Sequence, residues 1–297
     1  HFQPPHLLSE ERPRKIILMF SGGLGDAVSV GIVLPLVVLK YDIGIDICCS
    51  KDKWDDIFRP MGFMGRHIPF PPDLETLSAY DGLLADVTDF FYSSEGLSAS
   101  PVMQLLRGFN LEDEEVHSEY RIPQEIRKKN LLPPTPIPKI AFNPDFNGLV
   151  KSYPEKMMRQ ILEEFLKIGV EIYIFGAGGR SDEFHDLENV TDLRGKTSIP
   201  ELAAILDQMD IVIGVDSFIA HLSNLLKRPT IVLLSTTTQS YFRWHRYITC
   251  ISSEMQCAPC FSVFNKCPQG YTECRAFYHE SIGTKVIADC LQRYING

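Results

Sequence analysis

The chain has 297 residues, of which 44% are hydrophobic and 23% charged, so it is neither disordered nor of low complexity. Its 29 basic and 38 acidic residues give a net charge of -9, which argues against nucleic-acid binding. The net negative charge does not exclude a single anionic ligand, because one lysine and a helix N-terminus are enough to bind it. No apolar run reaches the ~20 residues of a bilayer-spanning helix. Since no signal peptide is visible either, we expect a cytoplasmic protein without a transmembrane segment, trimmed before His1.

The first half begins with a pattern of strand, glycine turn and helix, which opens a doubly wound α/β unit. A continuous apolar run of this kind is typical of a strand buried on both faces. The predicted elements are a strand at 15–20, a turn at 21–26, a helix to residue 40, and strands at 43–49 and 81–87. The adjacent Cys48 and Cys49 suit buried thiols better than a disulfide.

A proline-rich stretch at 121–139 separates the two halves. Proline at this density cannot continue a helix or a central strand. We therefore predict an inter-domain linker there, between an N-terminal domain at 1–132 and a C-terminal domain at 133–297.

The second half alternates strands and helices more regularly, which predicts a parallel sheet. Strands are expected at 139–143, 171–175, 211–215 and 230–234, and helices at 154–167, 200–209, 217–227 and 282–294. The final helix is assigned to the second domain, with packing on the first as an alternative. Two such domains joined by a linker leave a cleft, and ligands bind at the carboxyl ends of the strands facing it.

The glycine turn after the first strand holds one candidate catalytic residue, Asp26. Gly23 and Gly25 let the backbone approach a ligand closely, but Val28 breaks the dinucleotide fingerprint. A carboxylate here would repel a pyrophosphate and suits a general base acting on a sugar hydroxyl. The residues alone leave two interpretations equally open, this base and a cap for the following helix.

Two strand-end loops of the second half contain candidate donor ligands. The loop from Asn143 to Pro154 places Lys151 just before a helix, where a lysine and free N–H groups make an anion site. We favour this site over a solvated surface lysine. The loop from Gly176 to Asp182 is better explained as a tight turn, although Asp182 could hydrogen-bond a ribose.

A third strand end combines a carboxylate, a hydroxyl and an imidazole. Asp216 ends a strand, Ser217 opens a helix, and His221 lies one turn further on the same face. This trio could bind phosphate and sugar hydroxyls, and the structural alternative is a capped helix with a core-facing histidine. A serine hydrolase is disfavoured because the G-x-S-x-G elbow is absent from the sequence.

Four cysteines crowd into one short stretch near the C-terminus. They are Cys257, Cys260, Cys267 and Cys274. Four thiolates match tetrahedral metal coordination, and without a secretory signal this is favoured over disulfides. We predict a small finger that holds one structural zinc or iron ion.

Several of these segments together resemble the family 9 glycosyltransferases, the heptosyltransferase family. The matching segments are 23–26, Lys151, the run from Asp192 to Ser198, and the run from Met209 to His221. The resemblance implies the GT-B fold, with two Rossmann-like domains facing a cleft. The first domain would take a glycan, lipid-linked or protein acceptor, and the second a sugar nucleotide, commonly ADP-heptose.

The resemblance also implies roles for residues. Asp26 corresponds to the general base of an inverting, metal-independent transfer, near the turn glycines Gly23 and Gly25. Lys151 corresponds to the ligand of the donor phosphate and counts as catalytic. The implied donor-binding set is Asn143, Lys151, Asp182, Thr197, Asp216, Ser217 and His221. The cysteine finger is similar to one in the autotransporter heptosyltransferase branch, where four cysteines bind iron, and a bacterial, homo-oligomeric protein is expected.

Two features depart from the family pattern. Phe218 stands where the family pattern has a small residue beside the donor, and the first half of the chain is somewhat shorter than is usual in the family. Two alternative functions stay open. A nucleotide-dependent oxidoreductase lacks its glycine fingerprint here, and a non-catalytic sugar-nucleotide-binding or scaffold protein would use the finger for assembly.

Overall fold

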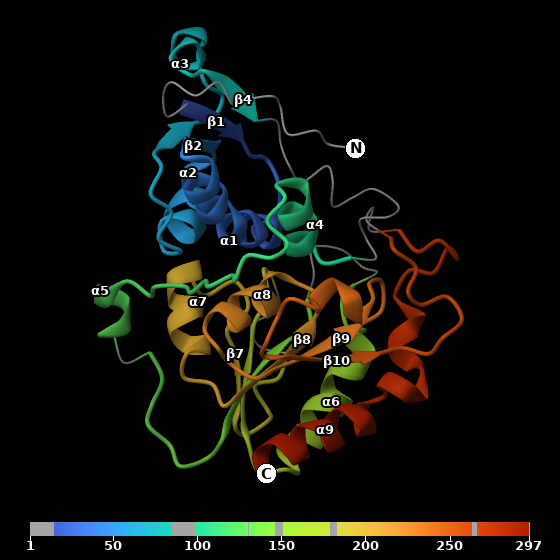
Figure 1. Ribbon diagram of the computed structural model, residues 1–297. Helices are drawn as coiled ribbons and strands as arrows, with labels where there is room; N and C mark the ends of the chain where they lie inside the picture. The colour runs from blue at the N-terminus through green and yellow to red at the C-terminus, as the bar shows by residue number, and fades with distance from the viewer. Residues whose placement is uncertain are drawn as a thin grey trace. The chain divides into compact units, whose positions relative to one another are not determined.

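The computed structural model describes residues 15–84, 99–129, 131–145, 151–178, 183–262 and 266–296. The chain forms two compact units, His1–Arg121 and Ile122–Gly297 (Figure 1). The division falls at the start of the proline-rich stretch. Part of that stretch forms a short helix, α5 (Gln124–Arg127), which contacts a helix of the second unit, α7 (Ile199–Leu206).

The described part of the first unit contains a parallel sheet of four strands in the order β3-β2-β1-β4. The strands are β1 (Lys15–Met19), β2 (Gly44–Cys49), β3 (His67–Pro69) and β4 (Gly82–Leu84). Cys48 and Cys49 are fully buried free thiols, as predicted. β1 and β2 match the prediction, whereas β3 was missed and the C-terminal part of the predicted strand at 81–87 lies outside the described residues.

The helices of this unit are α1 (Leu24–Tyr41), α2 (Lys51–Lys53), the π-helical turn η1 (Trp54–Phe58), α3 (Leu74–Ser78) and α4 (Pro101–Gly108). Among the described helices, α1 alone has the length and apolar composition of a membrane span, with a mean hydropathy of 1.7. However, 56% of α1 is buried inside the protein. It packs against α4 and η1, so its apolar sequence is that of a core helix.

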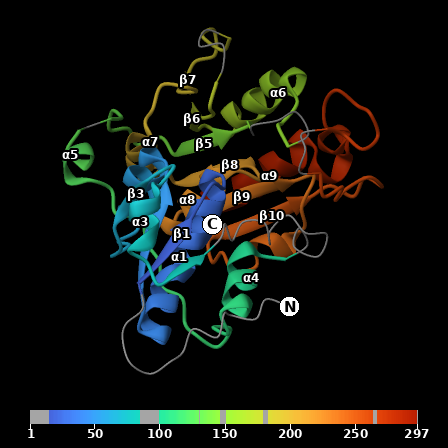
Figure 2. The same ribbon diagram turned by 90° about the horizontal axis from the view of Figure 1, so that it is seen from above.

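The second unit contains a parallel sheet whose six described strands run in the order β10-β9-β8-β5-β6-β7 (Figure 2). They are β5 (Lys139–Asn143), β6 (Glu171–Ile174), β7 (Val190–Asp192), β8 (Ile211–Val215), β9 (Thr230–Leu234) and β10 (Ile248–Ser252). All four predicted strands are present. The short β7 and β10 at the two edges were missed.

The remaining helices and helical turns of this unit are α6 (Glu155–Leu166), α8 (Phe218–Leu225), η4 (Gln239–Phe242), η5 (Arg275–Tyr278), η6 (Glu280–Ile282) and α9 (Thr284–Asn296). The predicted buried face of α6 is confirmed at Met158, Ile161, Leu162 and Phe165. α9 lies beside α6 (Figure 1), and Ile287 and Leu291 are fully buried in the core of the second unit. The apolar face of the final helix therefore contributes to the core of the second unit.

The strand order of the second sheet reverses between β5 and β8. In open parallel sheets such a switch point, at the carboxyl ends of the strands, is where ligands bind. Asn143 of β5 lies opposite Gly214 of β8. A Cβ atom at Gly214 would come within 3.0 Å of the Asn143 Cβ and carbonyl oxygen, so glycine is required for this close approach.

Candidate functional site

The switch point of the second sheet holds a buried amide that joins three strand ends. Asn143 donates from its side-chain nitrogen to the Phe175 carbonyl, 3.0 Å away, and so contacts the end of β6. Its side-chain oxygen accepts a hydrogen bond of 2.5 Å from the Ser217 hydroxyl after β8. Ser217 is the N-cap residue of α8 but its side chain makes no capping bond, because its hydroxyl is directed to Asn143.

Lys151 and Asp216 form an ion pair next to this amide. The Lys151 ammonium lies 2.9 Å from the Asp216 carboxylate, and the side chains are 16% and 6% exposed. Thr237, which follows β9, donates to the same carboxylate oxygen over 2.8 Å. Burial alone would raise the pKa of Asp216, but the Lys151 charge holds it below its ordinary value. The Asp216 carboxyl group is therefore ionised at neutral pH, and it faces the Lys151 side chain at a strand end.

His221 lies in the first turn of α8 and is almost fully buried. Its Nδ1 atom lies 2.9 Å from Nε2 of His245, a second buried histidine. Burial lowers the pKa of His221 to about 4, although the negative charge of Asp216 opposes this shift. Both imidazoles are neutral near pH 7, so His221 can offer a single N–H group to a ligand.

Asp145 is a further unusual group in the same region. One of its carboxyl oxygens is buried and has no hydrogen-bond partner. The same oxygen packs against Gly176, where the Cβ atom of any other residue would lie only 2.3 Å away from it. Burial, opposed by the charge of Arg194, raises the pKa of Asp145 to about 6. Sequence reasoning missed this carboxyl group, because its burial depends on the glycine at the end of β6.

The structure thus brings together Asn143, Lys151, Asp216, Ser217 and His221, five of the predicted donor-binding residues. Thr197 is half-buried in the loop before α7, and Asp182 lies outside the described residues. Thr237 and His245 were missed. A signal existed for Thr237, since it belongs to a run of hydroxyl residues directly after a predicted strand.

The run from Asp192 to Ser198 has structural contacts. Arg194 forms a two-point ion pair with Asp192, whose closest contact is 2.7 Å. Ser198 caps α7 reciprocally with Glu201, so the predicted cap at Ser198 is confirmed. These bonds fix the loop that enters α7.

In the first unit, Asp26 lies in the first turn of α1 and is 8% exposed. Gly23 is the N-cap residue of this helix, and its N–H group donates a hydrogen bond of 2.8 Å to the Asp26 carboxylate. Gly25 lies between them in the same turn. The capping interpretation of Asp26 therefore holds, and it does not conflict with a catalytic role, because a carboxylate has four lone-pair sites.

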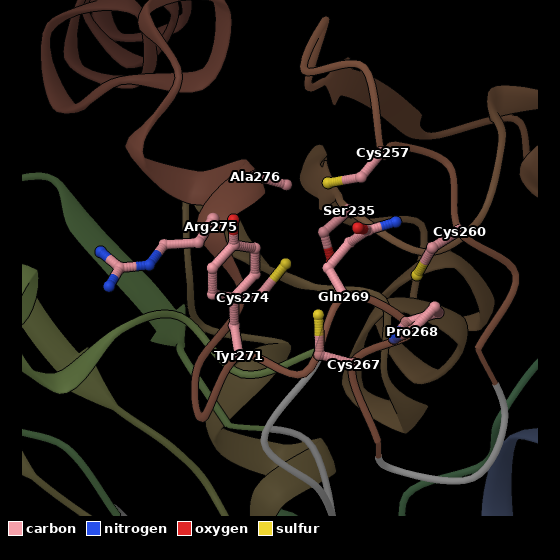
Figure 3. A pocket seen from close by; sticks show the side chains of 10 residues that line it. All are labelled: Ser235, Cys257, Cys260, Cys267, Pro268, Gln269, Tyr271, Cys274, Arg275 and Ala276. Atoms are coloured by element: carbon pink, nitrogen blue, oxygen red, sulfur yellow. The ribbon is translucent and has the colours of Figure 1, made fainter.

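The four clustered cysteines line one cavity of about 210 Å³ in the second unit. Figure 3 shows their sulfur atoms directed toward the middle of this cavity, beside Ser235 and Gln269. All four are free thiols, and burial raises the pKa of Cys260 and Cys274. Within the described residues no three His, Cys, Asp or Glu side chains form a group that could hold a metal ion. The predicted tetrahedral sulfur shell is thus not formed, although its four donors share one cavity.

The cysteine segment is anchored to the second sheet. The Phe261 N–H group donates to the Thr236 carbonyl, 2.8 Å away, just after β9. Cys274 is buried in the core cluster with Phe277. No helix or strand occurs in the described residues between 257 and 274, in agreement with the predicted finger.

Comparison with known proteins decides the family. The profile of glycosyltransferase family 9 (heptosyltransferase) matches residues 99–269, more than half of the chain. The chain belongs to glycosyltransferase family 9. The match includes the cluster at the ends of β5, β8 and β9, and most of the cysteine finger.

Two curated relatives of this family 9 chain come from Escherichia coli. Lipopolysaccharide heptosyltransferase 3 of strain K12 is 24% identical over 113 residues, which are 35% of this chain and 33% of the relative. Another lipopolysaccharide heptosyltransferase 3 is 41% identical over 54 residues, 18% of this chain and 16% of the relative. The aligned regions thus span a third or less of these relatives.

Solved structures establish the fold over nearly the whole chain. The E. coli ADP-heptose lipopolysaccharide heptosyltransferase II superposes with a TM-score of 0.69 at 11% identity, covering 95% of this chain and 98% of that one. TibC, described as a dodecameric iron-containing heptosyltransferase in complex with ADP-D-β-D-heptose, gives 0.70 at 12% identity, covering 96% and 76%. The fold is therefore the GT-B architecture predicted from the sequence.

Proposed function

We propose that this family 9 chain transfers a heptose from ADP-heptose to a hydroxyl group of a glycan, lipid-linked or protein acceptor, with inversion and without a divalent ion. The observation that carries the proposal is the buried Lys151–Asp216 pair at the switch point of the second sheet. ADP-heptose is favoured as donor because TibC is described in complex with ADP-D-β-D-heptose.

The donor diphosphate would be held by the residues of the second unit. Lys151 supplies a positive charge, and the first turn of α8 supplies backbone N–H groups that its N-cap side chain does not occupy. The interactions of the diphosphate with this charge and with these N–H groups strengthen as the departing diphosphate gains negative charge. They would therefore lower the barrier without a metal ion. Asp216, Ser217, Asn143 and His221 are proposed to orient the phosphate and sugar, together with Asp182 and Thr197.

The acceptor side would use Asp26. The acceptor hydroxyl attacks the anomeric carbon, the bond from that carbon to the diphosphate oxygen breaks, and the hydroxyl proton passes to the Asp26 carboxylate. Attack from the face opposite the leaving group inverts the anomeric centre. The Gly23 N–H group holds one oxygen of the carboxylate and thereby fixes its orientation.

The four cysteines are proposed to hold one structural iron or zinc ion. The donor set fits, because four thiols line one cavity and thiolate sulfur is a preferred ligand of both ions. Such an ion would fill its shell with sulfur and order the finger, with no position left for substrate. The description of TibC as iron-containing supports iron. Self-association and a cytoplasmic location also remain proposals.

The direct test is a panel of sugar nucleotides, ADP-heptose among them, with release of the nucleoside diphosphate as the readout. We expect ADP release from ADP-heptose that is unaffected by EDTA and increases when glycan or lipid-linked acceptors are added. ADP-heptose binding without any release, across all acceptors, would favour the non-catalytic sugar-nucleotide-binding protein instead. Absence of binding to every ADP-sugar would refute the proposal.

A further inference from the structure

The three residues that follow β9 contact both the cysteine finger and the candidate donor site. Ser235, Thr236 and Thr237 are all buried. Ser235 lines the cysteine cavity, and the Thr237 hydroxyl donates to the Asp216 carboxylate over 2.8 Å. The segment 235–237 therefore lies between two features that are separate in the sequence.

On the finger side, this segment takes part in two hydrogen bonds. The Ser235 hydroxyl donates to the Cys274 sulfur, and Figure 3 shows both residues at the same cavity. The Phe261 N–H group donates to the Thr236 carbonyl, 2.8 Å away. Phe261 directly follows Cys260 and has a φ of 51°, a left-handed conformation that persists at a residue other than glycine where surrounding contacts fix it. The place of the segment is therefore tied to the fold of the finger.

On the donor side, Thr237 and Lys151 meet at one atom. Oδ2 of Asp216 accepts from the Thr237 hydroxyl over 2.8 Å and from the Lys151 ammonium over 2.9 Å. A buried carboxylate oxygen that is held by two donors has a fixed direction, because rotation would break both hydrogen bonds. Without the hydroxyl, Lys151 would lose this fixed partner. The Thr237 hydroxyl therefore helps to decide where the Lys151 ammonium lies.

We propose that Thr237 is a positioning residue for the Lys151–Asp216 pair, and that the cysteine finger fixes Thr237 through the two residues before it. Thr237 acts through Asp216 and needs no contact with the donor for this role. The finger would then support donor binding in addition to its own folding. The effect on donor binding rests on the proposed function, whereas the hold of the finger on Thr237 does not.

Methyl NMR of the full chain with ¹³C-labelled threonine tests this hold directly. The spectrum of Thr237→Ser, which lacks the methyl group, assigns the Thr237 signal. We expect that signal to shift in Cys260→Ser and in Cys267→Ser, of which either suffices if the other fails to fold. The matched control is Ser262→Ala, which should leave the signal in place, because the Ser262 hydroxyl donates within the finger, to the Lys266 carbonyl over 2.7 Å. A Thr237 signal at its wild-type position in the folded cysteine variants would overturn the proposal.

A matched pair of substitutions tests the consequence for the donor. Thr237→Val keeps the shape of the side chain but removes the hydroxyl, whereas Thr237→Ser keeps the hydroxyl. We expect the Kd for ADP-heptose, measured by calorimetric titration, to rise about tenfold for the Val variant and to stay within about threefold of the wild type for the Ser variant. Equal affinities of the two variants would contradict the positioning role. If the wild type binds no ADP-sugar, the proposed function fails, and the methyl signal still decides whether the finger holds Thr237.

Discussion

At the scale of single residues, Lys151 and Asp216 stabilise each other as buried opposite charges. We expect Lys151→Met to destabilise the protein by about 3–5 kcal/mol at pH 7, because it leaves the Asp216 carboxylate unpaired. The double variant Lys151→Met/Asp216→Asn removes both charges and should recover most of this loss. Urea denaturation of the two variants measures the difference, and equal stability of both would show that the pair is not coupled.

Asp26 has two assigned roles, helix cap and proposed base, which one substitution separates. Asp26→Asn keeps an oxygen that can accept the Gly23 N–H bond but removes the basicity. We expect the transfer rate to fall by about 10²–10⁴-fold, with the thermal midpoint nearly unchanged. A rate within a few-fold of the wild type would rule out Asp26 as the base.

The carboxyl group of Asp145 predicts a pH dependence of stability. Its pKa in the folded protein, about 6, lies above the ordinary 3.8, so between these values the folded state binds more protons than the unfolded chain. Stability should therefore fall as pH rises through this window and stay lower above it. The variant Asp145→Asn lacks this titrating group. Its free energy of unfolding, relative to that of the wild type, should therefore increase by up to about 3 kcal/mol from pH 4 to pH 7. A constant difference across this range, in urea denaturation at each pH, would contradict the assignment.

At the scale of elements, the sequence pattern was sufficient where one element buries its own apolar run. β5, β8 and β9 have continuous apolar sequences and occur where predicted, and α6 shows the expected buried face. β7 and β10 are edge strands that are only partly buried, so their sequences contain no comparable run. Their positions depend on pairing with β6 and β9, which is not visible locally.

In the candidate site, too, local sequence predicts some residues, whereas others depend on contacts between remote segments. The sequence could predict that Lys151, Asp216, Ser217 and His221 lie together, because each is near a strand end or a helix start. The partner of His221 lies 24 residues away, in the irregular segment after η4, where neither periodicity nor spacing marks it. Contacts between remote loops are set by the folded sheet, so sequence reasoning could name part of the candidate site but not all its members.

The cysteine finger is an element whose order should depend on a metal ion. We expect about one iron or zinc per chain by elemental analysis, and loss of that metal in Cys257→Ser and in Cys267→Ser. Because Phe261 and Cys274 join the finger to β9 and the core, metal loss should also lower the thermal midpoint. Cys48→Ser, which changes a buried thiol of the first unit, is the control that should keep the metal. Metal-free protein with two disulfides among the four finger cysteines would contradict this prediction.

At the scale of the whole molecule, the two units contribute different parts of the proposed reaction. The first contains Asp26 at the turn after β1, and the second contains the charged cluster at its switch point. This division matches the GT-B architecture, in which the chemistry of each domain resides at the carboxyl ends of parallel strands. The family assignment rests on residues 99–269, whereas Asp26 lies before them, so its role depends on the substitution test above.

Calorimetric titration of the full chain with ADP-heptose tests the central claim most directly. The account predicts binding to the wild type in the presence of EDTA, and binding weakened at least tenfold in the double variant Lys151→Met/Asp216→Asn, whose fold is expected to persist. GDP- and UDP-sugars serve as the comparison ligands. Equal affinity of the wild type and the double variant for ADP-heptose would contradict the placement of the donor site at the ends of β5 and β8.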